Sequence, residues 1–123
     1  MQFEIFTGST AQVQADCIVV GVHEGSALSP LAAALDRQCA GKLTRFLKSG
    51  DFTGRLGETL LLPAFARMKA ERILLVGQGR TEVNRKAWSK ALHAAVSALS
   101  RTRCKTAAIA LTRPAPRELD DYL

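Results

Sequence analysis

Apolar and polar positions along the chain predict five β-strands. Residues 16–22, 72–76 and 106–111 are apolar on both faces, which is typical of parallel strands covered by helices on two sides. Residues 2–6 instead alternate between polar and apolar side chains, which predicts a half-buried strand. Residues 58–63 form a further apolar run closed by a proline, which predicts a fifth strand.

The segments between these strands carry helix signals. Ser29 and Pro30 suit the N-cap and first turn of a helix that Gly41 would end. A short second helix is expected over residues 42–49, and Asn84 suits the N-cap of a long helix running to about Ser100. Residues 23–27 are expected to form a loop, and residues 118–123 could begin a last helix.

This order of elements predicts the fold class. Doubly buried strands joined by helices imply an α/β protein, built as a three-layer α/β/α sandwich with a mixed sheet. The 123 residues are expected to form a single domain, residues 1–123, and the 47% apolar content is enough for one core. No apolar run approaches the roughly 20 residues of a membrane span. The first residues lack the features of a secretory signal, so a cytoplasmic location is expected.

The predicted helix over residues 84–100 has one apolar and one basic side. Its apolar stripe comprises Trp88, Leu92, Ala95, Val96 and Leu99, and its polar side comprises Lys86, Lys90, His93, Ser97 and Arg101. Residues 80–117 contain nine basic residues and one acidic residue, a net charge of +8, whereas the remainder carries −2. The candidate nucleic-acid contacts are therefore Lys86, Lys90, Arg101, Arg103 and Lys105. The alternative is a solvated surface, and no aromatic residues interleave with these cations to stack on bases.

The sequence Gly77-Gln78-Gly79 after the strand at residues 72–76 allows two interpretations. It could be a phosphate cradle at a helix N-terminus. A dinucleotide fingerprint, however, needs a third glycine and an acidic residue about 20 positions later. Both are missing, because Gly79 is followed by Arg80-Thr81-Glu82 and no acid occurs between Glu82 and Glu118. The alternative is a strand end at which glycine permits a positive φ.

Other catalytic constellations are absent from the sequence. His23 and His93 lie far apart, and the three cysteines show no C-x-x-C spacing, so a zinc site is not expected. The odd number of cysteines favours reduced, mostly buried thiols over disulfides. No serine lies in a G-x-S-x-G elbow.

Four motifs taken together resemble a known family. They are Ala15-Asp16-Cys17-Ile18-Val19-Val20-Gly21-Val22; Leu28-Ser29-Pro30 with Ala34-Leu35-Asp36; Gly54-Arg55-Leu56-Gly57-Glu58-Thr59-Leu60-Leu61-Leu62; and Glu71-Arg72-Ile73-Leu74-Leu75-Val76-Gly77-Gln78-Gly79. In this order, over nearly the whole chain, they resemble the N-terminal domain of the bacterial leucyl aminopeptidases (cytosol aminopeptidase, peptidase family M17). The resemblance makes Gly77–Gly79 a strand and turn of this scaffold.

The resemblance implies a macro-like domain that precedes a separate C-terminal catalytic domain. It also implies homo-hexamers that use two divalent metals, zinc or manganese, to remove N-terminal residues from peptides. The family's metal ligands lie in a block containing N-T-D-A-E-G-R-L, which has no match here. No catalytic or metal-binding residue is therefore assigned to this chain. It ends near the start of the family's linker helix and is expected to be truncated and inactive alone, with a role in assembly or active-site access.

Two rival functions follow from other features. Some bacterial relatives bind DNA, and the basic residues 80–117 are compatible with a DNA-binding module. The other rival is a stand-alone macro-type ADP-ribose binder, with Gly77–Gly79 near the phosphates. The asparagine-rich and glycine-rich loops of such macrodomains are not recognisable here.

Overall fold

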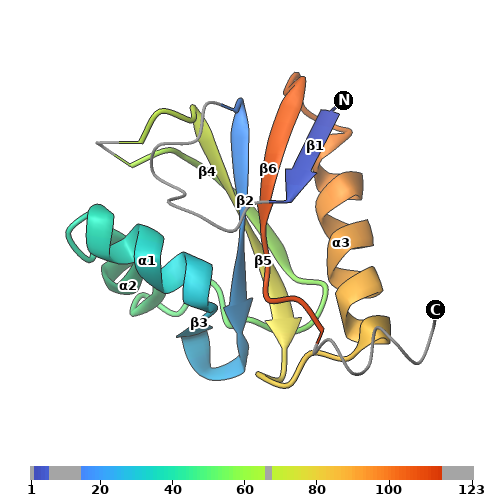
Figure 1. Ribbon diagram of the computed structural model, residues 1–123. Helices are drawn as coiled ribbons and strands as arrows, with labels where there is room; N and C mark the ends of the chain where they lie inside the picture. Colours follow the sequence, from blue (N-terminus) through green and yellow to red (C-terminus); the bar gives the residue numbers. More distant parts are fainter. Residues whose placement is uncertain (1, 6–14, 66–67, 115–123) are drawn as a thin grey trace.

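The computed structural model describes residues 2–5, 15–65 and 68–114. This part of the chain contains six strands and three α-helices, arranged as Figure 1 shows. The elements are β1 (Gln2–Ile5), β2 (Cys17–His23), a 3₁₀ turn (Glu24–Ser26), β3 (Ala27–Leu28), α1 (Pro30–Gln38), α2 (Lys42–Leu47), β4 (Thr59–Pro63), β5 (Arg72–Gly79), α3 (Arg85–Leu99) and β6 (Thr106–Ala110).

The strands form one mixed sheet in the order β1-β6-β2-β5-β4, with β3 attached to β2. The four strands β1, β6, β2 and β5 run parallel to one another, whereas β4 runs antiparallel to β5 and β3 antiparallel to β2. The doubly apolar runs thus occupy the centre of the sheet, as their pattern predicted.

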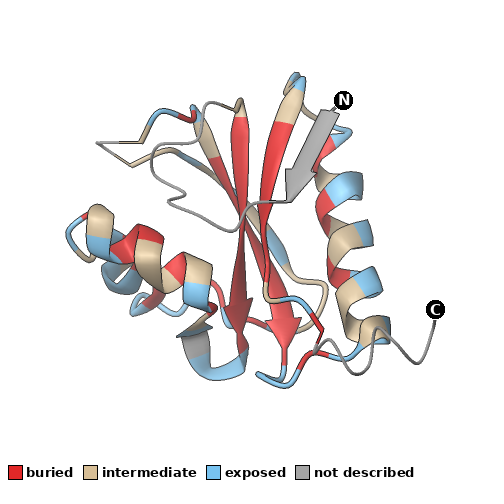
Figure 2. Cartoon of the chain, in the orientation of Figure 1, coloured by how far each residue is buried: buried red, intermediate tan, exposed pale blue. Residues whose placement is uncertain are grey.

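Helices cover both faces of the sheet, which confirms the predicted three-layer α/β/α sandwich (Figure 1). One hydrophobic cluster joins α1 and α2 to residues such as Ile18 and Leu75. The other joins α3 to residues such as Val19 and Leu74. Alternate side chains of β2 and β5 therefore enter opposite cores, and both strands are buried along their length (Figure 2).

Helices α1 and α3 begin at the N-cap residues that the sequence predicted, Ser29 and Asn84. The Ser29 hydroxyl accepts from the amide of Ala32 at 3.2 Å, and the Asn84 side chain accepts from the amide of Ala87 at 2.7 Å. The buried Asp36 carboxylate accepts from both the amide and the hydroxyl of Thr44 and so joins α1 to α2.

Three sequence predictions need correction. Strand β5 does not stop at Val76 but continues to Gly79, because its last residues pair with the end of β2 and hydrogen-bond to a neighbouring loop. Residues 23–27 form the end of β2, a 3₁₀ turn and the start of β3 rather than one loop. Val96 is 38% exposed, because it lies at the flank of the α3 stripe, whereas Ala91, Ala95 and Leu99 face the core.

Two predicted segments lie partly or wholly outside the described residues: the strand at residues 2–6, described only to Ile5, and the helix at residues 118–123. Among the described residues, no helix has the length and apolar character needed to cross a membrane.

Candidate functional site

The carboxyl ends of β2, β5 and β6 meet at one edge of the sheet, the usual place for ligands in open α/β folds. His23 ends β2, Gln78 lies near the end of β5, and Thr112 follows β6. The side chains of His23 and Gln78 are only 2% and 1% exposed. A functional site built on this fold would be expected at this edge. The hydrogen-bond partners of His23 and Gln78 therefore determine whether these side chains are available to a ligand.

Gln78 binds the backbone of Thr112 through both ends of its amide. Its Nε2 donates to the Thr112 carbonyl at 2.8 Å, and its Oε1 accepts from the Thr112 amide at 2.8 Å. A Cβ atom at Gly21 would overlap this Gln78 side chain, so glycine in β2 leaves the space that Gln78 fills. The pair joins the ends of β5 and β6 across β2.

His23 is equally engaged. Its Nδ1 lies 3.1 Å from the Arg80 carbonyl, which can only accept, so Nδ1 carries the proton and donates. Its Nε2 lies 2.9 Å from the Thr112 hydroxyl. Both ring nitrogens therefore bind protein groups, and the imidazole is occupied as a link between strand ends.

Two glycine motifs, at residues 54–57 and 77–79, hydrogen-bond to each other at this edge. The Gly54 carbonyl accepts from the Gly79 amide at 2.9 Å, and the Gly77 carbonyl accepts from the Gly57 amide at 3.0 Å. The Gly77 amide donates to the Glu58 carbonyl at 2.7 Å. We call this pairing of residues 54–58 with residues 77–79 the glycine contact. It uses the backbone groups that a phosphate cradle would offer to a ligand.

Glycine is required in this contact because two backbones approach closely. A Cβ atom at Gly77 would overlap the carbonyl of Arg55, and one at Gly54 would overlap the carbonyl of His23. Gly54 also has a φ of +89°. Gly79, with a φ of +71°, matches the prediction of a strand end at which glycine permits a positive φ.

Glu58 holds the loop of the glycine contact in shape. Its Oε1 accepts from the amides of Thr53, Gly54 and Arg55 at 3.1, 2.9 and 3.2 Å, and from the Thr53 hydroxyl at 3.0 Å. Partial burial opposes ionisation of Glu58, but these hydrogen bonds outweigh it and lower the pKa of the carboxyl below 4.5. The charged form of Glu58 is therefore part of the folded loop.

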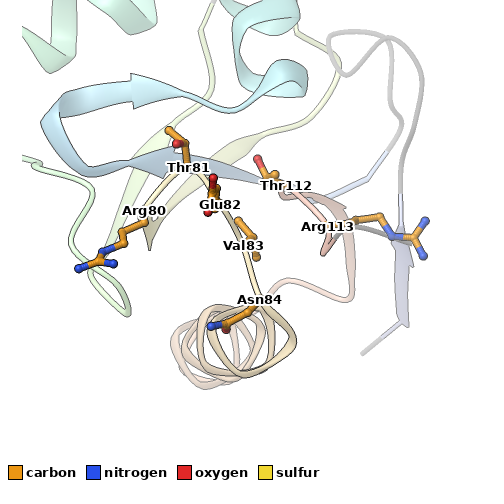
Figure 3. Close-up of a pocket in the computed structure, with 7 residues that line it drawn as sticks. All are labelled: Arg80, Thr81, Glu82, Val83, Asn84, Thr112 and Arg113. Carbon is orange, nitrogen blue, oxygen red and sulfur yellow. The ribbon is translucent and has the colours of Figure 1, made fainter. Parts of the chain in front are cut away.

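A hollow of about 640 Å³ lies beside this edge, between the β5–α3 connection and the residues after β6. Arg80, Thr81, Glu82, Val83, Asn84, Thr112 and Arg113 line it (Figure 3). In this view the guanidinium groups of Arg80 and Arg113 point away from the hollow in opposite directions. The arginines thus do not converge on one anion, although the hollow adjoins a helix N-terminus.

The five candidate nucleic-acid contacts, Lys86, Lys90, Arg101, Arg103 and Lys105, are all exposed. The structure divides them into two groups. Lys86 and Lys90 lie one turn apart on α3, whereas Arg101 follows the end of α3, about 20 Å from Lys86 at 1.5 Å per residue. Arg103 and Lys105 share a hollow of about 300 Å³ with Asp16 and Glu71, so acids stand beside the second group.

None of the three cysteines forms a disulfide in the structure. Burial, with a smaller contribution from nearby Cys104, raises the pKa of the Cys17 thiol to about 12. Among the described residues, no three histidine, cysteine, aspartate or glutamate side chains come together as a metal site. The donor set of these residues does not fit a two-metal centre.

A mixed sheet between two helical layers defines the class of this protein as a three-layer α/β/α domain. The chain matches the cytosol aminopeptidase family, N-terminal domain, over residues 19–122. It therefore belongs to that family.

Individual relatives agree with this assignment. The chain is 44% identical over 106 residues to the probable cytosol aminopeptidase of Cupriavidus pinatubonensis, which covers 85% of this chain and 21% of that protein. It is 34% identical over 113 residues to the probable cytosol aminopeptidase of Haemophilus ducreyi, covering 91% and 23%. The chain thus spans about a fifth of the length of the curated relatives it matches.

Solved structures share the fold. A mutant of tomato leucine aminopeptidase superposes with a TM-score of 0.65 and 25% identity, covering 90% of this chain and 23% of that chain. The macrodomain of Mycobacterium tuberculosis DarG also gives a TM-score of 0.65, covering 88% and 74%. The second match is only 12% identical and shows the fold alone.

The sequence did not indicate that its two glycine motifs meet. The signal was present in Gly54-x-x-Gly57 and Gly77-x-Gly79, two glycine pairs about 20 residues apart on either side of a predicted hairpin of strands. Their glycines hydrogen-bond to each other, and His23 and Gln78 complete the same edge.

Proposed function

We propose that this chain acts as the non-catalytic N-terminal domain of a cytosolic, metal-dependent leucyl aminopeptidase. The observation that carries the proposal is the family match over residues 19–122, together with a span of about a fifth of each relative's length. The remaining length of such a protein would hold the catalytic domain, and that domain would bind the two divalent ions, zinc or manganese. The closed carboxyl edge supports a scaffold role for this domain.

Hydrolysis of leucine p-nitroanilide tests this assignment. The purified 123-residue chain should give no turnover with added manganese or zinc, whereas the product of the whole gene should be active. A metal-dependent reaction catalysed by the pure chain, retained through further purification steps, would overturn the assignment.

Assembly is the second part of the proposal. This domain would pack against its own C-terminal catalytic domain, support a homo-hexamer and shape access to the active site. Deleting residues 1–123 from the whole gene product should reduce hexamer formation, measured as mass by light scattering. An unchanged hexamer with unchanged peptide selectivity would contradict the role in assembly and access.

A second candidate function is DNA binding by the five exposed basic residues. It is supported by the +8 charge of residues 80–117 and by the exposure of Lys86, Lys90 and Arg101. Reversing these three charges in the whole protein should weaken a gel shift of duplex DNA and reduce its dependence on salt. Binding that is unchanged and insensitive to salt would eliminate this function.

A further inference from the structure

Strand β4 is one edge of the sheet, and its outer side is open in the described part of the chain. It pairs only with β5, in the antiparallel register Leu61↔Leu74. The amide of Ala64 donates to Glu71 and the carbonyl of Glu58 accepts from Gly77, so even-numbered residues direct their backbone groups toward β5. Odd-numbered residues of β4 consequently direct theirs outward.

The outward groups form a definite pattern of donors and acceptors. Thr59 and Leu61 each present an N–H and a C=O, whereas Pro63 presents only a C=O. An unpaired row of this kind is a template for another extended strand. The chemistry of the edge therefore calls for a partner with a β-strand backbone.

The devices that usually protect such an edge are weak here. Natural proteins place lysines or other charges on exposed edges to prevent pairing. Thr59–Pro63 contains no charged residue, and Glu58, which precedes it, turns its carboxylate into the loop of Thr53–Arg55. The charged residues Glu71 and Arg72, which line a hollow with Leu61–Pro63, belong to β5 and the residue before it rather than to the open edge. Leu61 is 39% exposed and, with Val96, is one of the two large hydrophobic side chains exposed among the described residues.

We propose that β4 pairs antiparallel with β4 of a second copy of this chain across a two-fold axis at Leu61. A two-fold axis perpendicular to the sheet makes the two edges antiparallel and their contacts reciprocal. Only the register that places Leu61 opposite its own mate overlaps all five residues of both strands. In it each Leu61 exchanges two hydrogen bonds with the other, and each Thr59 N–H donates to the partner's Pro63 carbonyl. Pro63 then faces a position where its missing N–H costs one bond.

The size of this contact determines how strongly the chain should associate. Stable complexes bury about 800 Å² on each partner, and a pair of five-residue edges buries less. The association of this chain alone is therefore weak and depends on concentration. The proposal rests on the proposed assembly into homo-oligomers and names one surface through which copies meet.

Sedimentation velocity over a wide concentration range tests the proposal, with Leu61→Lys and a matched control. The wild-type chain should form dimers, and Leu61→Lys should weaken dimerisation by about tenfold or more, because it places two like charges opposite each other at the two-fold axis. Val96→Lys places the same charge on an equally exposed side chain of α3 and should leave dimerisation unchanged. Circular dichroism should show all three proteins folded.

Cross-linking tests the register. In a hydrogen-bonded antiparallel pair the two Cα atoms lie about 5.5 Å apart, within the range of a disulfide. In a Cys104→Ser background, Leu61→Cys should oxidise to a covalent dimer and Val96→Cys should not. A monomeric wild-type chain at every concentration, or dimers equally sensitive to both lysine variants, would overturn the proposal. In the second case the proposed assembly would stand and only the β4 surface would fail.

Discussion

The glycine contact and the five basic residues occupy neighbouring stretches of the chain, residues 54–79 and 86–105, yet their environments are opposite. In the glycine contact the four glycines bind other protein groups through their backbones, and two of them are required by close approach. The basic residues are exposed and divided into two groups. A motif that identifies a family can therefore be a packing element, whereas changes to the exposed charges are expected to leave the fold intact.

Apart from the glycines, the substitution expected to lower the free energy of unfolding most is at Gln78. Gln78→Leu keeps the side-chain volume but removes both hydrogen bonds to the Thr112 backbone, leaving a donor and an acceptor unpaired. The free energy of unfolding should fall by about 2 kcal/mol or more, measured by urea denaturation. A loss below about 0.5 kcal/mol, the size of an ordinary surface change, would show that the carboxyl edge does not need this link.

A smaller, pH-dependent effect is expected at Glu58. Glu58→Gln should cost about 1 kcal/mol at neutral pH, because the loop amides lose a charged acceptor in a partly solvated position. Since the folded pKa lies below 4.5, the contribution of Glu58 is complete above 4.5 and is lost as the pH falls through the lowered pKa.

Denaturation midpoints of wild type and Glu58→Gln across the acidic range measure this dependence. The two proteins should differ most above pH 4.5 and converge on acidification. A difference that grows toward low pH would contradict a lowered pKa for the Glu58 carboxyl in the folded protein.

The basic residues should respond little in stability. Lys86→Glu and Arg101→Glu change exposed side chains and should shift the free energy of unfolding by less than about 0.5 kcal/mol. Thermal denaturation of each variant checks this. A loss comparable with that of Gln78→Leu would mean that these cations have partners in the fold and would remove the contrast between the two regions.

The smallest expected effect is on ligand binding, because we expect the chain not to bind ADP-ribose. The fold is shared with macrodomains, but the backbone groups of Gly77 and Gly79 are hydrogen-bonded to the 54–58 loop, and Gln78 fills the space above Gly21. Calorimetry of the chain with ADP-ribose should therefore show no binding heat. A saturable heat that Gln78→Leu alters would place a ligand at this edge.

Much of the fold followed from sequence periodicity because local rules control it. The apolar runs of β2, β5 and β6 and the caps at Ser29 and Asn84 were predicted and confirmed. The end of β5 was not, because Gly77–Gly79 extends the strand through pairing with the end of β2 and through hydrogen bonds to a loop some 20 residues earlier. Helical periodicity also misplaced Val96, since the width of a buried stripe depends on how the helix lies on the sheet.

The candidate site was less predictable than the fold. The spacing of the glycines left two roles open for Gly77–Gly79, a ligand cradle or a packing element. Only the three-dimensional contacts distinguish these two roles. The sequence around His23 and Gln78 did not indicate their partners, because Arg80 and Thr112 belong to other segments. The sequence identified the basic residues as a set. It did not show that some lie on α3 while Arg103 and Lys105 share a hollow with Asp16 and Glu71.

Unfolding of Gly77→Ala, compared with Gly25→Ala, tests most directly whether the glycine motif is a packing element. Gly77 has no positive φ, but a Cβ there would overlap the Arg55 carbonyl; Gly25 has a φ of +78° and open space around it. Gly77→Ala should lower the free energy of unfolding by about 3 kcal/mol or more, and Gly25→Ala by about 1 kcal/mol. A Gly77→Ala protein as stable as wild type would contradict the account.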